Sequence, residues 1–241
     1  MNPAELTLVL LAGGGGTRIR HLHPHLPKPL IPVAGRPFLE WVCRWWIRQG
    51  VRRMVVGLGH LAETAMRHID GMNLEGVELA AVCEPRPLGT GGGALFVARA
   101  VELSDPCIIA NADSLAFGDL APVFEMLDEA TLDGVVLAVA MEDASRYGTL
   151  RVDRAGLLEG FEEKRPGRGV INAGVYLLRR RLLDRFPARE PLSMEYHVFP
   201  ALVAAGARLR VHTLEGPFLD IGTPESLAQA GSFIEKHMAL L

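Results

Sequence analysis

Hydrophobic runs of five to eight residues alternate, through the first half of the chain, with segments whose apolar residues recur at helical spacing. The short runs predict strands at 6–12, 53–58, 77–83, 106–111 and 134–141, and the periodic segments predict helices at 37–49, 90–101 and 119–130. Thr90 and Asp119 are expected to cap the last two helices. This alternation is typical of βαβ units in a mainly parallel sheet.

The pattern changes after about residue 145. Short strands are expected at 149–153, 157–162, 170–178 and 214–219, with helices at 194–205 and 224–238. The predicted fold class is therefore α/β, with a Rossmann-like, mainly parallel mixed sheet flanked by helices. We expect a single domain, 1–241, with two lobes, 1–141 and 142–241, and no room for a fused domain after the closing helix.

The composition and charge of the chain argue against some classes of function. The chain has 241 residues, 22% of them charged, and a formal net charge of −3. This balance argues against a general nucleic-acid or membrane binder, which needs a sustained basic face. Its three cysteines are unclustered, which is typical of reduced thiols in a cytoplasmic protein. The apolar run 6–12 is too short to span a bilayer and lacks the features of a leader.

A glycine loop and two nearby cations carry the first chemical signal. Four glycines, 13–16, follow the first predicted strand, and Arg18 and Lys28 come soon after, the lysine between two prolines. Backbone N–H groups of such a loop can converge on phosphate oxygens. The spacing matches neither a dinucleotide fingerprint nor a Walker loop. A phosphate-binding loop with two fixed cations favours displacement at phosphorus.

Together the motifs resemble those of the sugar-1-phosphate nucleotidyltransferases. That family has Leu-Ala-Gly-Gly-x-Gly-Thr-Arg followed by Pro-Lys-Pro-Leu-x-Pro-Val, found here at 11–18 and 27–33. Further family-like segments follow in order at 84–92, 111–113, 147–148, 163–164, 172–174 and 220–223. The resemblance implies an enzyme that transfers a nucleoside monophosphate from a nucleoside triphosphate to a sugar 1-phosphate, releasing pyrophosphate.

The resemblance also implies roles for individual residues. Arg18 and Lys28 would be catalytic, and Asp113 and Asp220 would bind Mg²⁺, a hard ion that takes few protein ligands. The first lobe would bind the nucleotide through Leu11, Ala12, Gly13, Gly14, Gly15, Gly16, Thr17, Glu84, Pro87, Leu88, Gly89, Thr90, Asn111 and Ala112. The second lobe would bind the sugar phosphate through Tyr147, Gly148, Glu163, Lys164, Asn172 and Gly174.

One residue departs from the family pattern. Ala112 stands where the family usually has glycine. Its methyl group restricts the backbone and is expected to crowd an approaching ribose or sugar.

Substrate identity stays open at this stage. Segments 37–40, 146–150, 171–176 and 193–200 are most similar to family members that use GTP and D-glycero-α-D-manno-heptose 1-phosphate, for cell-surface polysaccharide. The alternatives are UTP, CTP or dTTP with a hexose 1-phosphate or N-acetylmuramic acid 1-phosphate. A non-catalytic regulatory subunit that binds a nucleotide-sugar is the alternative of another class. A second copy of the chain is a candidate partner, with Trp41 or Trp46 at the contact.

Overall fold

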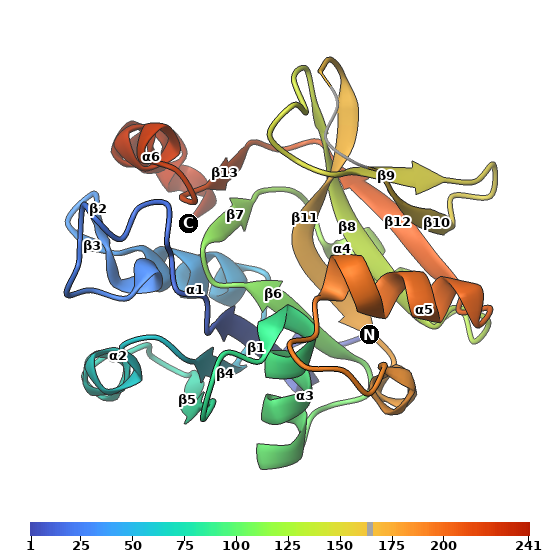
Figure 1. Cartoon of the computed structure of the whole chain (residues 1–241), viewed down its shortest axis with the longest axis horizontal. Helices are drawn as coiled ribbons and strands as arrows, with labels where there is room; N and C mark the ends of the chain where they lie inside the picture. The colour runs from blue at the N-terminus through green and yellow to red at the C-terminus, as the bar shows by residue number, and fades with distance from the viewer. Residues whose placement is uncertain (163–165) are drawn as a thin grey trace.

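The computed structural model describes residues 1–162 and 166–241, and within them one nine-stranded sheet forms the centre of the molecule (Figure 1). The strands are β1 (Thr7–Ala12), β2 (Pro32–Val33), β3 (Arg36–Pro37), β4 (Arg53–Leu58), β5 (Glu78–Cys83), β6 (Cys107–Asn111), β7 (Ser114–Ala116), β8 (Gly134–Met141), β9 (Thr149–Val152), β10 (Leu158–Glu162), β11 (Gly169–Leu178), β12 (Leu209–Leu214) and β13 (Phe218–Asp220). The α-helices are α1 (Phe38–Arg48), α2 (Ala62–Asp70), α3 (Gly89–Ala100), α4 (Ala121–Met126), α5 (Phe199–Ala204) and α6 (Pro224–Lys236). Short 3₁₀ turns span Pro3–Glu5, Lys28–Leu30, Arg180–Arg185 and Met238–Leu240, and a π-type turn spans Met194–Val198.

Strand order joins both halves of the chain in one sheet. The order is β10-β9-β11-β6-β1-β4-β5, and β8 pairs with both β11 and β12. Pairs β1–β4, β1–β6, β4–β5 and β8–β12 are parallel, whereas β11 runs antiparallel to β6 and β8. The fold is therefore the Rossmann-like mixed sheet that the sequence predicts.

Helices cover both faces of this sheet. Alternate residues of β1 point to opposite faces, so that Leu8 and Leu10 belong to one core and Val9 to the other. Helices α1, α2, α4 and α6 pack on the first core, and α3 and α5 on the second. In Figure 1, α1 and α2 lie to the left, α3 at the bottom, and β9 and β10 to the right.

The structure corrects several predicted elements. The helix expected at 119–130 is only Ala121–Met126, and the one expected at 194–205 divides into the turn Met194–Val198 and α5. The strand expected at 214–219 does not exist as such, because β12 ends at Leu214 and β13 begins at Phe218. Helix α2 was not predicted, because only Ala65 and Ile69 of its residues are buried.

Two predictions about side chains are also wrong. Trp41 and Trp46, considered for a subunit contact, are 5% and 1% exposed and lie in the core of a single chain. Thr90 does not cap α3, since Leu88 occupies the N-cap position. The Thr90 hydroxyl instead accepts a hydrogen bond from the backbone N–H of Met194 (2.9 Å). No helix in the described part of the chain is long and apolar enough to cross a membrane.

Candidate active site

The phosphate-binding loop and the first aspartate meet because their strands are neighbours. Strands β1 and β6 run parallel with Leu11 opposite Asn111, so their carboxyl ends meet at the same edge of the sheet. The loop after β1 and Asp113 after β6 therefore border one cavity of about 180 Å³. Its lining includes Leu11, Ala12, Gly14, Gly16, Thr17, Arg18, Lys28, Asp113 and Gly222.

A two-stranded ribbon brings the second aspartate to the first. Strands β7 and β13 pair antiparallel, with Asp220 opposite Ser114. The backbone N–H of Ile221 donates to the carbonyl of Asp113 (3.1 Å). Residues more than a hundred positions apart in the sequence are thus held side by side by backbone hydrogen bonds, which a local pattern cannot predict.

Lys28 lies between the two aspartates. Its Nζ is 2.5 Å from Oδ2 of Asp113 and 3.6 Å from Oδ1 of Asp220, and its side chain is 10% exposed. Burial and the nearby Asp113 charge raise the pKa of Asp220, whereas Lys28 and the backbone N–H of Gly222 act in the opposite direction. Two carboxylates that repel each other in a half-closed site therefore need a cation between them.

This convergence fits a divalent cation. The lysine ammonium group shows that one positive charge can contact both carboxylates at once. Within the described residues, no group of three or more His, Cys, Asp or Glu side chains is placed to hold a metal. An ion held by the two aspartates would also take phosphate oxygens and water as ligands, as Mg²⁺ sites commonly do.

A larger cavity of about 750 Å³ opens beside the aspartates. Arg18 and Asp113 line both this space and the smaller cavity, whereas Asp220 lines only the larger one. Arg18 therefore lies where the two cavities meet. The larger cavity also collects the predicted residues Asn111, Tyr147, Gly148, Asn172 and Gly174. The predictions for Glu163 and Lys164 fall outside the described residues.

A break in the register of β11 aims Asn172 at this cavity. The pairing of β11 with β8 shifts between Asn172 and Tyr176, and Gly174 within the break has φ of +72°. Asn172 Oδ1 accepts from the backbone N–H of Gly174 (3.0 Å). A side chain at position 174 would collide with the Asn111 side chain. Glycine is required at position 174 because the positive φ and the nearby Asn111 side chain both exclude a Cβ atom.

Glu84 approaches the glycine loop from the end of β5. Its carboxylate lies so close to Gly13 and Gly59 that a methyl group at either position would collide with it. Burial raises the pKa of Glu84, against a smaller opposing effect of the Leu88 backbone N–H. This placement puts an acceptor beside the loop that is expected to hold the nucleotide.

The predicted nucleotide segment after β5 lines neither cavity. Glu84, Pro87, Leu88, Gly89 and Thr90 are absent from both linings. Leu88 and Gly91 instead exchange backbone hydrogen bonds with Leu192, at 2.8 Å each. We name these paired segments, 88–91 and 192–194, the base-loop clamp. Their direct contact with a nucleotide stays a prediction.

Ala112 does not crowd the site. Its side chain is fully buried in the same core as Leu8 and Leu10, and its N–H donates to the Leu11 carbonyl (3.1 Å). The methyl group therefore packs under the cavity floor. The expectation that it would obstruct a ribose or sugar is wrong.

Sequence reasoning missed several residues of the larger cavity. Arg146 lies at its edge, donates to Thr223 Oγ1 (2.9 Å) and is 5.7 Å from the centre of the Tyr147 ring. Glu195 and Tyr196 line the cavity from the π-type turn. The segments 146–150 and 193–200 carried a resemblance to family members, but it assigned no role to these residues. The other missed lining residues include Phe161, Pro200 and Phe218.

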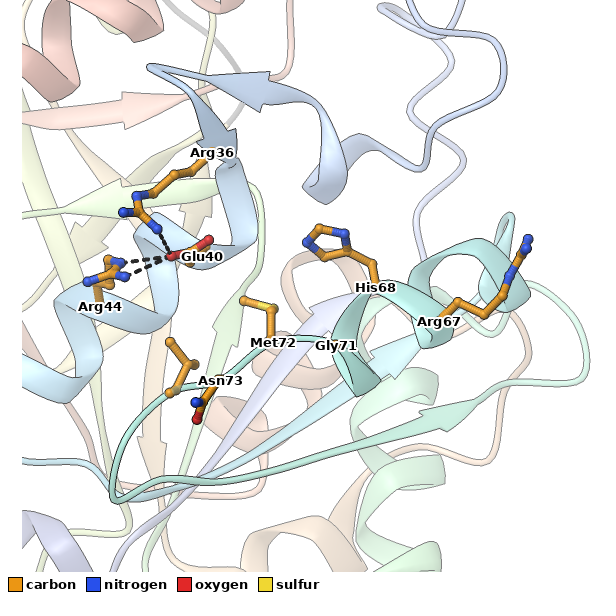
Figure 2. Close-up of a pocket in the computed structure, with 9 residues that line it drawn as sticks. Arg36, Glu40, Arg44, Arg67, His68, Gly71, Met72 and Asn73 are labelled. Carbon is orange, nitrogen blue, oxygen red and sulfur yellow. Dashed lines mark hydrogen bonds and ion pairs between the residues drawn. The ribbon is translucent and has the colours of Figure 1, made fainter.

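A further cavity of about 380 Å³ lies between α1 and α2, away from these motifs (Figure 2). Arg36 and Arg44 both contact Glu40 there, at 2.5 and 2.8 Å. Arg67 extends away from that cluster, whereas His68 points toward it. The two arginines thus form ion pairs with Glu40, and none of the predicted site residues that the structure describes lines this space.

The glycine loop, the two aspartates and Lys28 thus lie together at one edge of the sheet. The family model described as nucleotidyl transferase matches residues 7–237. The chain therefore belongs to the nucleotidyl transferase family, which is a family of enzymes.

Individual relatives are similar to most of this chain. The chain is 31% identical to D-glycero-alpha-D-manno-heptose 1-phosphate guanylyltransferase from Campylobacter jejuni, over 90% of the chain and 95% of that protein. It is 30% identical to mannose-1-phosphate guanylyltransferase from Mycobacterium tuberculosis, over 98% of the chain but 66% of that longer protein. The crystal structure of HddC from Yersinia pseudotuberculosis complexed with GMP-PN superposes with a TM-score of 0.82 at 28% identity, covering 95% of this chain and 99% of that one.

Proposed function

We propose that the protein transfers GMP from GTP to a sugar 1-phosphate, forming a nucleotide-sugar and pyrophosphate. The observation that carries the proposal is the convergence of Arg18, Lys28, Asp113 and Asp220 at the junction of two cavities. The smaller cavity has the glycine loop for phosphates, and the larger has room and polar groups for a sugar. The best candidate acceptor is D-glycero-α-D-manno-heptose 1-phosphate.

The reaction needs alignment and charge neutralisation more than a protein nucleophile. A phosphate oxygen of the sugar 1-phosphate attacks the α-phosphorus, and the bond from that phosphorus to the pyrophosphate oxygen breaks. Arg18, at the junction, neutralises the charge that develops on the transferring group and the leaving pyrophosphate. Lys28 reduces the repulsion between the two anionic substrates. Mg²⁺ bound at Asp113 and Asp220 would supply further charge neutralisation on the phosphate oxygens.

Glu84 favours guanine over other bases. A carboxylate only accepts hydrogen bonds, and guanine presents two adjacent donors, the ring N1–H and the exocyclic amino group. Uracil and thymine present one N–H between two carbonyl oxygens, which would face the carboxylate unfavourably. The relative crystallised with a guanine nucleotide analogue supports the same donor.

The acceptor is a sugar with the manno configuration in both leading alternatives. The Campylobacter jejuni relative acts on a manno-heptose 1-phosphate and the Mycobacterium tuberculosis relative on mannose 1-phosphate, by their names. These acceptors differ by one hydroxylated carbon. We favour the heptose because the chain covers 95% of the first relative and 66% of the second.

A panel of nucleoside triphosphates crossed with sugar 1-phosphates, read as pyrophosphate release with Mg²⁺, tests the proposal. We expect release with GTP and the heptose 1-phosphate to have the highest kcat/KM, with mannose 1-phosphate next. Release with UTP alone would overturn the donor assignment. No release from any pair, with a finished nucleotide-sugar still bound, would favour the non-catalytic regulatory subunit.

Replacement of Glu84 by glutamine should weaken the preference for GTP. The amide keeps the size of the side chain but replaces one acceptor with a donor, so the kcat/KM ratio of GTP to UTP should fall about 10-fold to 100-fold, the effect of losing a hydrogen bond to a charged group. Glu78→Gln is the matched control, since Glu78 is exposed at the other end of β5. An unchanged ratio in the Glu84 variant would remove this residue from base recognition.

A further inference from the structure

Glu195 is a carboxylate built into the wall of the larger cavity, and none of the sequence motifs assigns it a role. It lies in the first turn of Met194–Val198, whose N-cap is Ser193. The side chain is half-buried and lines the same cavity as Asp113, Asp220 and Asn172. Because Glu195 lies beside the predicted sugar-binding residues, its hydrogen-bonding chemistry can indicate which ligands it would bind.

Three side chains hold this carboxylate in one orientation. Ser193 Oγ donates to Oε2 (2.9 Å), and the Tyr176 hydroxyl donates to Oε1 (3.3 Å). Asn172 Nδ2 donates to the Tyr176 hydroxyl (2.7 Å) and lies 3.5 Å from Glu195 Oε1. Because Asn172 Oδ1 already accepts from Gly174, the amide presents its donor end to this network. Tyr176 is 1% exposed, so the network rests on a buried, fixed hydroxyl.

The backbone that carries Glu195 is equally well fixed. The N–H of the preceding residue, Met194, donates to Thr90 Oγ1, and Leu192 exchanges hydrogen bonds with Leu88 and Gly91 in the base-loop clamp. Met194 itself is fully buried. A carboxylate held in this way is preorganised, so little conformational entropy is lost when a ligand binds to it.

The chemistry of the group defines the ligand. An ionised carboxylate accepts hydrogen bonds and donates none, with about four lone-pair sites on its two oxygens. A ligand that reaches it must bring donors, as sugar hydroxyls do. A ligand that brings a second carboxylate would place two negative charges together in a partly desolvated site, which is unfavourable. Aromatic side chains of the same cavity, Tyr147, Phe161 and Phe218, offer apolar surface for the C–H faces of a sugar ring.

We propose that Glu195 is the specificity residue that selects neutral, hydroxyl-bearing sugar 1-phosphates and excludes those that carry a carboxylate on the sugar. This inference rests on the proposed function, since it assigns the acceptor class of the same site. It separates the acceptors left open by the sequence: mannose and manno-heptose 1-phosphates fit, whereas N-acetylmuramic acid 1-phosphate, with its lactyl carboxylate, does not.

Calorimetric binding of two matched ligands tests the assignment without turnover. Mannose 1-phosphate and mannuronic acid 1-phosphate differ only in having a hydroxymethyl or a carboxylate group on the ring. We expect the wild-type protein to bind the neutral sugar at least 10-fold more tightly. In Glu195→Gln this ratio should fall about 10-fold or more, because a charged acceptor is replaced by a neutral amide. Glu125→Gln, an exposed change on α4, should keep the wild-type ratio.

A second variant separates recognition from folding. Glu195→Asp keeps the negative charge but withdraws it from the cavity, so it should bind mannose 1-phosphate more weakly while still rejecting the uronate. An unchanged ratio in Glu195→Gln with an unchanged melting temperature would overturn the assignment, as would wild-type binding of neither ligand or equal binding of both. If Glu195→Gln does not fold, the aspartate variant decides: loss of discrimination there would also overturn it.

The same measurements distinguish this inference from the proposed function. Selective binding that depends on Glu195, with no pyrophosphate release from any substrate pair, would leave the sugar subsite in place and overturn the transferase. Pyrophosphate release with GTP, combined with a ratio that ignores Glu195, would keep the transferase and overturn the subsite.

Discussion

Arg18→Ala should reduce kcat by about 100-fold or more, because it removes the guanidinium group at the junction of the two cavities, where charge develops during transfer. The effect should fall on kcat more than on KM, since the interaction is strongest in the transition state. Pyrophosphate release under saturating GTP and sugar 1-phosphate measures it. Arg18 is exposed, so the variant should fold normally.

Arg20→Ala is the matched control for this experiment. Arg20 lies two residues further along the same loop, is exposed, and lines neither cavity of the site. Its variant should keep near wild-type turnover. Near-normal turnover in Arg18→Ala itself would refute the catalytic role of Arg18, whatever the control shows.

Asp220→Asn should lower Mg²⁺-dependent activity by about 100-fold to 1,000-fold, the scale expected when a metal site that supplies several kcal/mol of charge stabilisation is broken. The same change should leave the melting temperature equal to or above that of the wild type. Burial and the Asp113 charge raise the pKa of Asp220 in the folded protein. Its ionised form is therefore disfavoured by folding, and neutral asparagine removes that penalty at pH 7.

Two measurements check the Asp220 prediction independently. Calorimetric titration of the protein and a non-hydrolysable GTP analogue with Mg²⁺ should show weaker metal binding, and thermal unfolding at pH 7 should show no loss of stability. Asp184→Asn, at an exposed aspartate, should change neither. A variant that binds Mg²⁺ as well as the wild type would remove Asp220 from the metal site.

The strands of the first half of the chain were predictable because each is an apolar run bounded by turn residues. Strands β4 and β8 begin and end where the hydrophobic pattern places them, and β1, β5 and β6 differ by one residue. Helix α2 and strand β12 escaped because their patterns are weak: α2 buries few residues, and the middle of β12 is only partly buried. Hydrophobic periodicity predicts elements only where burial is strong.

The site shows the same division between local and distant information. Resemblance singled out Asp113 and Asp220 as candidate metal ligands, but their approach to Lys28 depends on the ribbon of β7 and β13. Glu195 lies in the segment 193–200, which resembles family members of one substrate class, but the sequence assigned this residue no role of its own. Its network with Tyr176 and Asn172 forms because a bulged strand and a π-type turn meet. Thr90 was misplaced as a helix cap for a similar reason, since its partner Met194 is distant in the sequence.

The base-loop clamp joins the segment that is expected to bind the base to the segment that carries Glu195. The segment 192–194 is hydrogen-bonded to the loop at 88–91, and the next residue, Glu195, lines the larger cavity. Suppose the loop 88–91 is replaced by that of a relative with another nucleotide preference. The new loop would then lack a matching segment 192–194 and would shift Glu195 in the larger cavity. Redesign of either preference should transplant both segments as one unit, and divergence within such enzymes should change them in concert.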